Sequence, residues 1–253
     1  MSSFQKELWA KAADILKESR LAIAMTGAGI SVPSGIPDFR SPGGLWSKFD
    51  PQQVCSDWAL INNPHGVWEF LLEAVKMFAA ARPNPGHLTL ARMEQTGIIN
   101  SIITQNIDNL HQLAGSANVI EFHGGCGSFY CNQCRKDFDP ALALNLNEKD
   151  IPWLCNDCQG IIRPSVVFFG EQIPAQAMLQ SQDLAERADV VLIVGTSGEV
   201  APANVFPQWI KRRGGKIIEI NLGSTAYDGL SDLKLDMPAE IALPGIMDML
   251  DRQ

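Results

Sequence analysis

The sequence has no apolar run longer than a β-strand, whereas a helix that crosses a bilayer needs about 20 apolar residues. Segment 1–20 carries charges throughout and lacks the apolar core and cleavage site of a secretory signal. We therefore expect a cytoplasmic protein with no membrane partner. Thiols stay reduced in that compartment, which disfavours disulfides as an explanation for the cysteines.

Basic residues are also in short supply. The chain carries 20 Lys and Arg against 28 Asp and Glu, a net charge of −8. Because nonspecific nucleic-acid binding depends on neutralising phosphates, we expect no direct nucleic-acid partner. An acidic surface is compatible with basic partners such as lysine-rich peptides, although charge alone does not identify one. The 46% hydrophobic and 19% charged residues are ordinary for a globular protein and argue against disorder.

The sequence shows no internal repeats, and apolar runs instead alternate with helical patterns. Strand-like runs occupy residues 21–29, 98–106, 118–124, 165–170, 189–197 and 216–223. Helical patterns cover residues 4–19, 64–82, 87–97 and 173–188, and a short helix is predicted from Pro244. Because buried strands that alternate with helices are typical of a doubly wound parallel sheet, we predict an α/β fold.

The segment from Cys131 to Cys158 interrupts this alternation, and we interpret it as part of an inserted small module. We predict a Rossmann-like domain that comprises residues 1–50, 83–128 and 163–253. The small domain is predicted to comprise residues 51–82, a helical module, and residues 129–162, a zinc module.

The glycine-rich segment 26–40, TGAGISVPSGIPDFR, follows the first predicted strand. A turn at this place can bring backbone N–H groups close to a pyrophosphate. The match to a dehydrogenase fingerprint is poor, because Val32 stands where a third glycine is required, and no G-K-[ST] follows. A dinucleotide site and a tight turn without a ligand both remain open from this segment alone.

Polar side chains gather after the second predicted strand, in TQNIDNLHQLAG (104–115). Gln105, Asn106 and Asp108 would lie at the carboxyl end of that strand, where open α/β sheets bind ligands. Capping of the next helix by Asn106 or Asp108 is the alternative, and it accounts for one residue better than for three.

His123 ends another predicted strand and suits the role of general base near neutral pH. A lone histidine is more often structural, and this alternative stays open. His111 lies in a helical context and is interpreted as structural, whereas His65 and His87 precede helices and are interpreted as boundary residues.

Four cysteines form two C-x-x-C pairs: Cys131, Cys134, Cys155 and Cys158. This spacing is typical of a tetrahedral zinc site, and four thiolates leave no open coordination position for water. We therefore predict a structural zinc ion. A thioredoxin-like redox motif is the alternative, but it needs only one pair. Cys55 and Cys126 remain, each interpreted as a buried small hydrophobe or a free thiol.

Taken together, these motifs resemble the sirtuins, which are NAD-dependent protein-lysine deacylases. The resemblance covers about residues 10–250 and rests on GAGISVPSGIPDFR, TQNIDNLH, HG at 123–124, the paired cysteines, RPSVVFFGE (163–171), GTS (195–197) and INLG (220–223). It implies a Rossmann-like domain with a divergent glycine turn and an inserted zinc module.

The resemblance also implies the reaction and its residues. Acyl-lysine and NAD would give lysine, nicotinamide and 2′-O-acyl-ADP-ribose, with His123 as the base and Asn106 as the second catalytic residue. The implied NAD contacts are Gly27, Ala28, Gly29, Val32, Asp38, Phe39, Arg40, Gln105, Ile107, Asp108, His123, Gly195, Thr196, Ser197, Asn221, Leu222, Gly223 and Pro238. The implied contacts to the acyl-lysine peptide are Val167, Phe168, Gly170 and Glu171.

Members of this family that remove succinyl or malonyl groups carry a Tyr-x-x-Arg pair at the places of Leu71 and Ala74, so the resemblance implies neutral acyl groups. The sequence departs from the family pattern at Gly198 and Glu199, and at Gly223. A mono-ADP-ribosyltransferase, a non-enzymatic NAD-sensing or zinc-scaffold protein and an NAD dehydrogenase are the alternatives. The missing third glycine disfavours the dehydrogenase.

Overall fold

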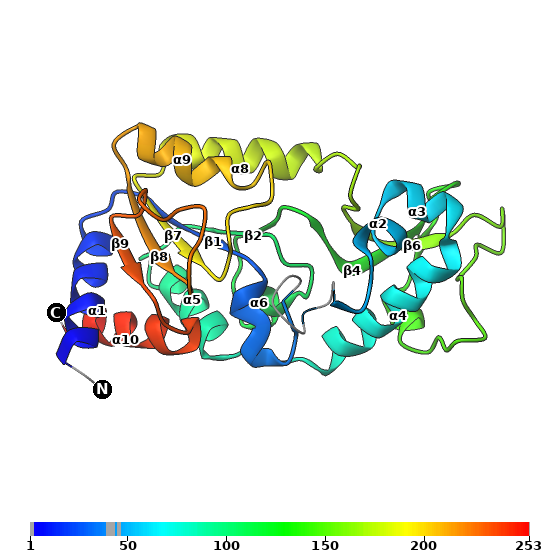
Figure 1. Ribbon diagram of the computed structural model, residues 1–253, viewed down its shortest axis with the longest axis horizontal. Helices are drawn as coiled ribbons and strands as arrows, with labels where there is room; N and C mark the ends of the chain where they lie inside the picture. The colour runs from blue at the N-terminus through cyan, green and yellow to red at the C-terminus, as the bar shows by residue number, and fades with distance from the viewer. Residues whose placement is uncertain (1–2, 39–43, 45–46, 253) are drawn as a thin grey trace.

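The structure is a computed structural model that describes residues 3–38, 44 and 47–252. It is elongated, with a large sheet and its helices at one end and a smaller sheet at the other (Figure 1). The first and last helices, α1 (Ser3–Lys17) and α10 (Ala239–Asp251), pack together at the far end of the large sheet. Within the described ranges, no helix has the length and hydropathy needed to cross a bilayer.

Six parallel strands form the large sheet, which confirms the predicted α/β fold. Their spatial order is β3 (Val119–Glu121), β2 (Ile102–Thr104), β1 (Ala22–Thr26), β7 (Val190–Val194), β8 (Lys216–Ile220) and β9 (Leu233–Leu235). Thr26 pairs with both Thr104 and Val194, so the central strands end level with one another. Their carboxyl ends therefore share one edge of the sheet.

Helices cover both faces of the large sheet (Figure 1). One face carries α1, α10 and α5 (Pro85–Gln95), and the other carries α8 (Ala175–Arg187) and α9 (Val205–Arg212). In β1, Ala22 and Ala24 belong to the first of these cores, and Ile23 and Met25 to the second. A strand that is buried on both faces in this way reads as a continuous apolar run.

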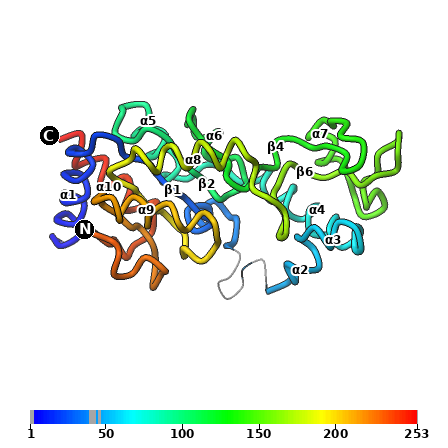
Figure 2. The backbone as a smooth tube through the Cα atoms, turned by 90° about the horizontal axis from the view of Figure 1, so that it is seen from above, coloured from blue at the N-terminus to red at the C-terminus, as the bar shows by residue number. Residues whose placement is uncertain are grey.

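The smaller sheet is antiparallel and holds β4 (Gly124–Cys131) between β5 (Asp137–Phe138) and β6 (Ile162–Val166). The helices α2 (Pro51–Val54), α3 (Asp57–Asn62), α4 (Pro64–Ala80) and α7 (Pro140–Ala143) lie around it, as Figure 2 shows. Its core is built on Trp68, which is fully buried and donates from Nε1 to the Ile162 carbonyl at 2.8 Å. The predicted domain boundaries 128/129 and 162/163 fall inside β4 and at the start of β6.

Short polar side chains fix where several helices begin. Asp50, Ser56, Asn63 and Asp139 each accept a hydrogen bond from a backbone N–H of the first turn of α2, α3, α4 and α7. Asn84 does the same for α5, and the side chain of His87 accepts in return from the Asn84 N–H. This reciprocal cap confirms His87 as a residue of a helix boundary.

Three details of the sequence prediction are wrong. The apolar run 165–170 belongs mostly to the loop after β6, and β6 pairs antiparallel with β4 rather than in the large sheet. Strand β9 was missed, because it spans only Leu233–Leu235 with a lysine at its centre. Helix α10 begins at Ala239 and runs through Pro244, since the burial of Leu243, Ile246 and Met247 outweighs one lost backbone hydrogen bond.

Candidate active site

A large cavity opens at the carboxyl ends of the central strands and extends to the smaller sheet. Its volume is about 790 Å³, in the upper part of the range of about 300–1,000 Å³ that small-molecule and cofactor sites occupy. Its walls come from the turns that follow β1, β2, β7 and β8, from residues 166–171 and from α4. This is the edge at which open α/β sheets bind ligands.

The glycine-rich turn after β1 leads into the 3-10 helix η1 (Ala28–Ser34) and packs against the turn after β7. A Cβ at Gly29 would lie 2.8 Å from the Gly195 Cα, and a Cβ at Gly27 would lie 2.7 Å from the Thr196 Cβ. The N–H of Gly29 donates to the Gly195 carbonyl at 2.8 Å, and that of Gly27 donates to the Val194 carbonyl at 3.0 Å. The two glycines therefore allow the turns to approach, and their N–H groups are already paired within the protein.

Amide side chains tie the strand ends to one another. Gln105, after β2, donates from Nε2 to Thr196 Oγ1 at 3.0 Å, which links β2 to the turn after β7. Asn106 donates from Nδ2 to the Gly27 carbonyl at 3.1 Å. Asn221, after β8, donates to the Thr196 carbonyl at 2.6 Å. These bonds cross from strand to strand and hold the floor of the cavity in one shape.

Asp108 lies behind the cavity wall, with 6% of its surface exposed. Its carboxylate accepts a hydrogen bond from Ser31 Oγ at 2.6 Å and from the Leu110 N–H at 2.9 Å, at the start of α6 (Leu110–Leu113). Burial raises the pKa of Asp108, and these two donors oppose that rise. Asp108 thus accepts from the first residue of α6, but the N-cap residue is Asn109, which makes no side-chain capping bond, so the predicted N-cap role of Asp108 is not confirmed. The same carboxylate also orients Ser31.

His123 lines the cavity at the end of β3. Its Nδ1 lies 3.1 Å from the Gln105 carbonyl, which can only accept, so Nδ1 carries the proton and Nε2 is the acceptor. Burial lowers the pKa of His123 below its ordinary 6.5, and the hydrogen bond to Gln105 opposes this shift. The imidazole is therefore neutral at pH 7, as a general base must be.

The other two histidines of this region form a buried pair. His111 is 1% exposed, and its Nε2 lies 2.9 Å from Thr26 Oγ1. His87 is fully buried, its ring centroid lies 5.0 Å from that of His111, and its Nε2 lies 3.4 Å from Ser31 Oγ. Burial lowers the pKa of His87 to about 4 and, with a smaller effect of the His87 charge, that of His111 to about 3.

The end of the cavity nearest the smaller sheet is apolar. Its walls include Phe70, Leu71 and Ala74 of α4, together with the thiols of Cys55 and Cys126. Burial raises the pKa of both thiols to about 12, so they are uncharged. Both are free and half-buried, which confirms the free-thiol alternative for these two cysteines. The sequence prediction did not place Phe70, Cys55 or Cys126 at the cavity. For Phe70, its helical spacing to Ala74 is the one signal in the sequence; the two cysteines carry no comparable signal.

Most of the predicted contact residues that the structure describes line this cavity. They are Gly27, Ala28, Gly29, Val32, Asp38, Gln105, Asn106, Ile107, His123, Val167, Phe168, Gly170, Glu171, Gly195, Thr196, Ser197, Asn221, Leu222 and Pro238. Asp108 and Gly223 do not belong to the lining, and Phe39 and Arg40 lie outside the described residues. The lining also includes Val200 and Thr225, which the sequence prediction missed.

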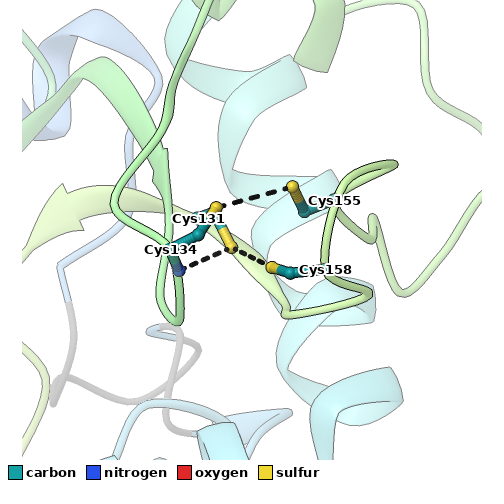
Figure 3. A group of neighbouring side chains, drawn as sticks. All are labelled: Cys131, Cys134, Cys155 and Cys158. Carbon is teal, nitrogen blue, oxygen red and sulfur yellow. Dashed lines mark hydrogen bonds between the residues drawn. The ribbon is translucent and has the colours of Figure 1, made fainter.

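The four predicted metal ligands come together in the small module, as Figure 3 shows. The sulfurs of Cys131, Cys134, Cys155 and Cys158 all lie within 4.8 Å of one another. The Cys131–Cys158 and Cys134–Cys155 sulfur distances are 3.4 and 3.8 Å. Tetrahedral zinc with Zn–S bonds of about 2.3 Å requires sulfur separations of about 3.8 Å, so the cluster fits a structural zinc ion.

Comparison with known proteins places the chain among close relatives. The model of the Sir2 family matches residues 27–202. The NAD-dependent protein deacetylase of Caldivirga maquilingensis is 48% identical over 94% of this chain and 92% of its own length.

Solved structures show the same likeness. One, described as "Structural Basis for the Mechanism and Regulation of Sir2 Enzymes", superposes with a TM-score of 0.91 at 38% identity, over 98% of this chain and 99% of the other. A complex described as Sir2, p53 peptide and NAD+ superposes with a TM-score of 0.86 at 37% identity, over 96% and 98%. The chain belongs to the Sir2 family.

Proposed function

We propose that this chain is an NAD-dependent protein-lysine deacylase that removes acetyl groups and releases lysine, nicotinamide and 2′-O-acyl-ADP-ribose. One observation carries the proposal: a neutral His123 lies on the wall of a single cavity whose polar end follows the strand ends and whose other end is apolar. The polar end suits a dinucleotide and the apolar end suits an acylated lysine. The name of the Caldivirga relative and the NAD+ complex agree with this assignment.

When bound, NAD would supply a ribose carbon that loses nicotinamide and bonds to the acyl oxygen, and a ribose hydroxyl that takes the acyl group, with one water consumed. His123 would take the proton of that hydroxyl at Nε2, because Nδ1 already donates to the Gln105 carbonyl. Asn106 and Gln105 hold the ribose side of the cavity through their bonds to the turns after β1 and β7. The turns at Gly27–Gly29 and at Gly195–Ser197, with Asn221, would receive the pyrophosphate and adenosine.

We infer a preference for neutral acyl groups from the apolar end of the cavity. Leu71 and Ala74 stand on its wall, and neither offers a cation to a succinyl or malonyl carboxylate. A carboxylate buried there without a partner carries a large desolvation cost. The acyl-lysine partner is a protein or peptide that lies along Val167–Glu171. We further infer a cytoplasmic protein of two domains, the smaller of which is built around the core of Trp68.

The test is incubation of an acetyl-lysine peptide with NAD, with nicotinamide release and loss of the acetyl group measured together. We expect one nicotinamide for each acetyl group removed, and acetylated and propionylated peptides should react faster than a succinylated one. Deacetylation without NAD consumption would refute the proposal. Labelled NAD separates it from the alternative, because only a mono-ADP-ribosyltransferase leaves label on the protein.

A further inference from the structure

Arg163, on β6, is a buried cation to which the proposed reaction gives no task. Its side chain is 1% exposed. The guanidinium forms a bidentate salt bridge with the carboxylate of Glu171, to which both terminal nitrogens donate, and the Nη2–Oε2 distance is 2.7 Å. Nη2 also donates to the Val166 carbonyl at 2.5 Å, and Nε donates to the Pro164 carbonyl at 3.3 Å. All three nitrogens therefore hold the chain that follows Arg163.

Two aromatic rings enclose the same guanidinium. Its central carbon lies 4.4 Å from the ring centroid of Phe168 and 5.7 Å from that of Tyr130. Such contacts are attractive and favour the planar guanidinium over an ammonium group. Phe168 is 1% exposed and lines the cavity, whereas Arg163 does not line it. The cation therefore packs against Phe168 from within the protein, behind the cavity wall.

The segment Val166–Glu171, which runs from the end of β6 into the following loop, forms a turn held at both ends. Glu171 accepts a hydrogen bond from the Phe168 N–H at 2.9 Å. Burial alone would raise the pKa of Glu171, but the hydrogen bonds from Arg163 and Phe168 outweigh it and hold the pKa below its ordinary value. The Val167 N–H donates to the carbonyl of His123 at 2.9 Å, so the turn lies directly against the proposed base.

The same cation connects this turn to the four-cysteine cluster. Tyr130 precedes Cys131 and pairs with Arg163 in the smaller sheet. Arg135, next to Cys134, also lies over the Tyr130 ring, at 5.2 Å. The chain of contacts therefore runs from the metal module through Tyr130 and Arg163 to the cavity wall at Phe168.

We propose that Arg163 is a positioning residue for the acyl-lysine substrate. Its bidentate salt bridge with Glu171 fixes the conformation of the turn Val166–Glu171, and this places Phe168 in the wall of the acyl-lysine channel. This inference rests on the proposed deacylase function. Arg163 is not among the residues that line the cavity, and its hydrogen-bond partners belong to the segment 164–171 rather than to the turns after β1, β7 and β8. Its loss should therefore weaken the use of the peptide and spare the binding of NAD.

Arg163→Lys tests this, because an ammonium keeps the charge but cannot form the planar fork. Misplacing the wall in this way should raise the KM for an acetyl-lysine peptide by about tenfold or more. The Kd for NAD, measured on the zinc-loaded protein without peptide, should stay within about twofold of wild type, as should the zinc content. Glu171→Gln removes the carboxylate partner of this salt bridge and should also raise the KM for the peptide.

Arg187→Lys is the matched control, because Arg187 pairs with Asp183 on the exposed surface of α8. This substitution should leave the peptide KM, the Kd for NAD and the zinc content unchanged. The double variant Arg163→Lys with Glu171→Gln should raise KM by less than the product of the single effects, since both substitutions disrupt the same salt bridge. If Arg163→Lys is insoluble, Glu171→Gln decides.

Peptide KM values in both variants within about twofold of wild type would overturn the positioning role, as would a parallel loss of NAD affinity. If the wild type deacetylates the peptide and the variants have the same KM, only the positioning role of Arg163 is refuted. If the wild type neither binds nor deacetylates the peptide, the proposed function is refuted as well.

Discussion

His123, the proposed base, has a pKa set by two opposing influences. Burial lowers the pKa and disfavours the imidazolium, whereas the hydrogen bond to the Gln105 carbonyl opposes that shift and fixes the proton of the neutral ring on Nδ1. The pKa therefore lies below its ordinary 6.5, and Nε2 is an acceptor throughout the neutral range.

His123→Ala should lower the deacylation rate by about 10²–10⁴-fold, because a positioned base contributes on that order. The melting temperature should change little, since His123 lies at the rim of the large sheet and not in its core. Steady-state kinetics with an acetyl-lysine peptide and a thermal melt measure the two effects. His65→Ala is the control and should keep full activity; comparable activity in the two variants would remove His123 from its assigned role.

The pH profile of the wild type provides a second measurement of the same group. Protonation of Nε2 removes the acceptor, so kcat/KM falls as the pH drops through the pKa of His123. Because that pKa is lowered, the acidic limb should lie below pH 6.5. A midpoint above pH 6.5 would contradict the assignment of this limb to His123.

At the scale of elements, the turns after β1 and β7 work as a pair. Gly29 and Gly195 meet backbone to backbone, and Gly195 adopts φ +64, where a Cβ would lie 2.3 Å from the Ile30 nitrogen. Side chains in either turn would separate the two strand ends that carry the floor of the cavity. The pairing of turns thus turns a local sequence feature into the shape of the binding site.

Gly29→Ala should destabilise the protein by about 1–3 kcal/mol, because the added methyl group meets backbone atoms that cannot move aside without shifting a strand end. The affinity for NAD should fall as well. Gly127→Ala is the control: a Cβ there meets no atom within 4 Å, and the change should stay within about 0.5 kcal/mol. Chemical denaturation and NAD titration compare the two, and equal effects would refute the pairing.

Sequence reasoning succeeded best where one physical signal dominates. The run at β1 is buried on both faces, and Val190–Val194 of β7 likewise, so each reads as an uninterrupted apolar strand. It failed at 165–170, where most of an equally apolar run lines the cavity and the Val166 carbonyl accepts a hydrogen bond from Arg163. An apolar run records that its residues are buried but does not specify which sheet or cavity they face.

The site was predictable to a similar degree. Gln105 and Asn106 were expected at a strand end, because a buried strand precedes them. The bonds that they make to Thr196 and Gly27 join residues far apart in the chain and follow only from the order of the strands. The apolar role of Cys55 and Cys126 as cavity walls also depends on how the smaller sheet meets the larger one.

At the scale of the whole molecule, the four cysteines drawn in Figure 3 belong to the module around the smaller sheet, which forms one end of the elongated protein (Figure 1). Trp153 lies two residues before Cys155 and contacts Trp68, with ring centroids 5.8 Å apart. A zinc ion held by the four cysteines would therefore anchor the loop that covers the core of the smaller sheet. Four thiolates would close its coordination shell and leave no position for water or substrate.

The protein should contain one zinc ion per chain, and Cys155→Ser should abolish its retention. Loss of the metal removes a large stabilising contribution, and a loss of about 3 kcal/mol would lower the melting temperature by roughly 6–12 °C. Elemental analysis measures the zinc content, and tryptophan fluorescence measures the melting temperature. Cys126→Ala is the control and should keep its zinc; a zinc-free Cys155→Ser protein that melts like the wild type would show that the module does not need its metal.

The buried pair His87 and His111 makes the stability of the whole protein depend on pH. Unfolded, each has a pKa near 6.5; folded, the pKa values are about 4 and about 3. Between pH 6.5 and about 4 the unfolded chain binds protons that the native chain does not, so the free energy of unfolding falls as the pH drops. Each histidine contributes up to about 1.4 kcal/mol per pH unit in this window.

The double variant His87→Gln with His111→Gln should therefore show a shallower loss of stability with acid than the wild type, by up to about 2.7 kcal/mol per pH unit. Asp108, whose pKa burial raises, titrates in the opposite sense, so the comparison of slopes is more informative than the wild-type slope alone. Urea denaturation at pH 7, 6 and 5 measures the slopes. If the double variant keeps the wild-type slope, the acid sensitivity has another origin, because these two imidazoles are then not held neutral by the fold.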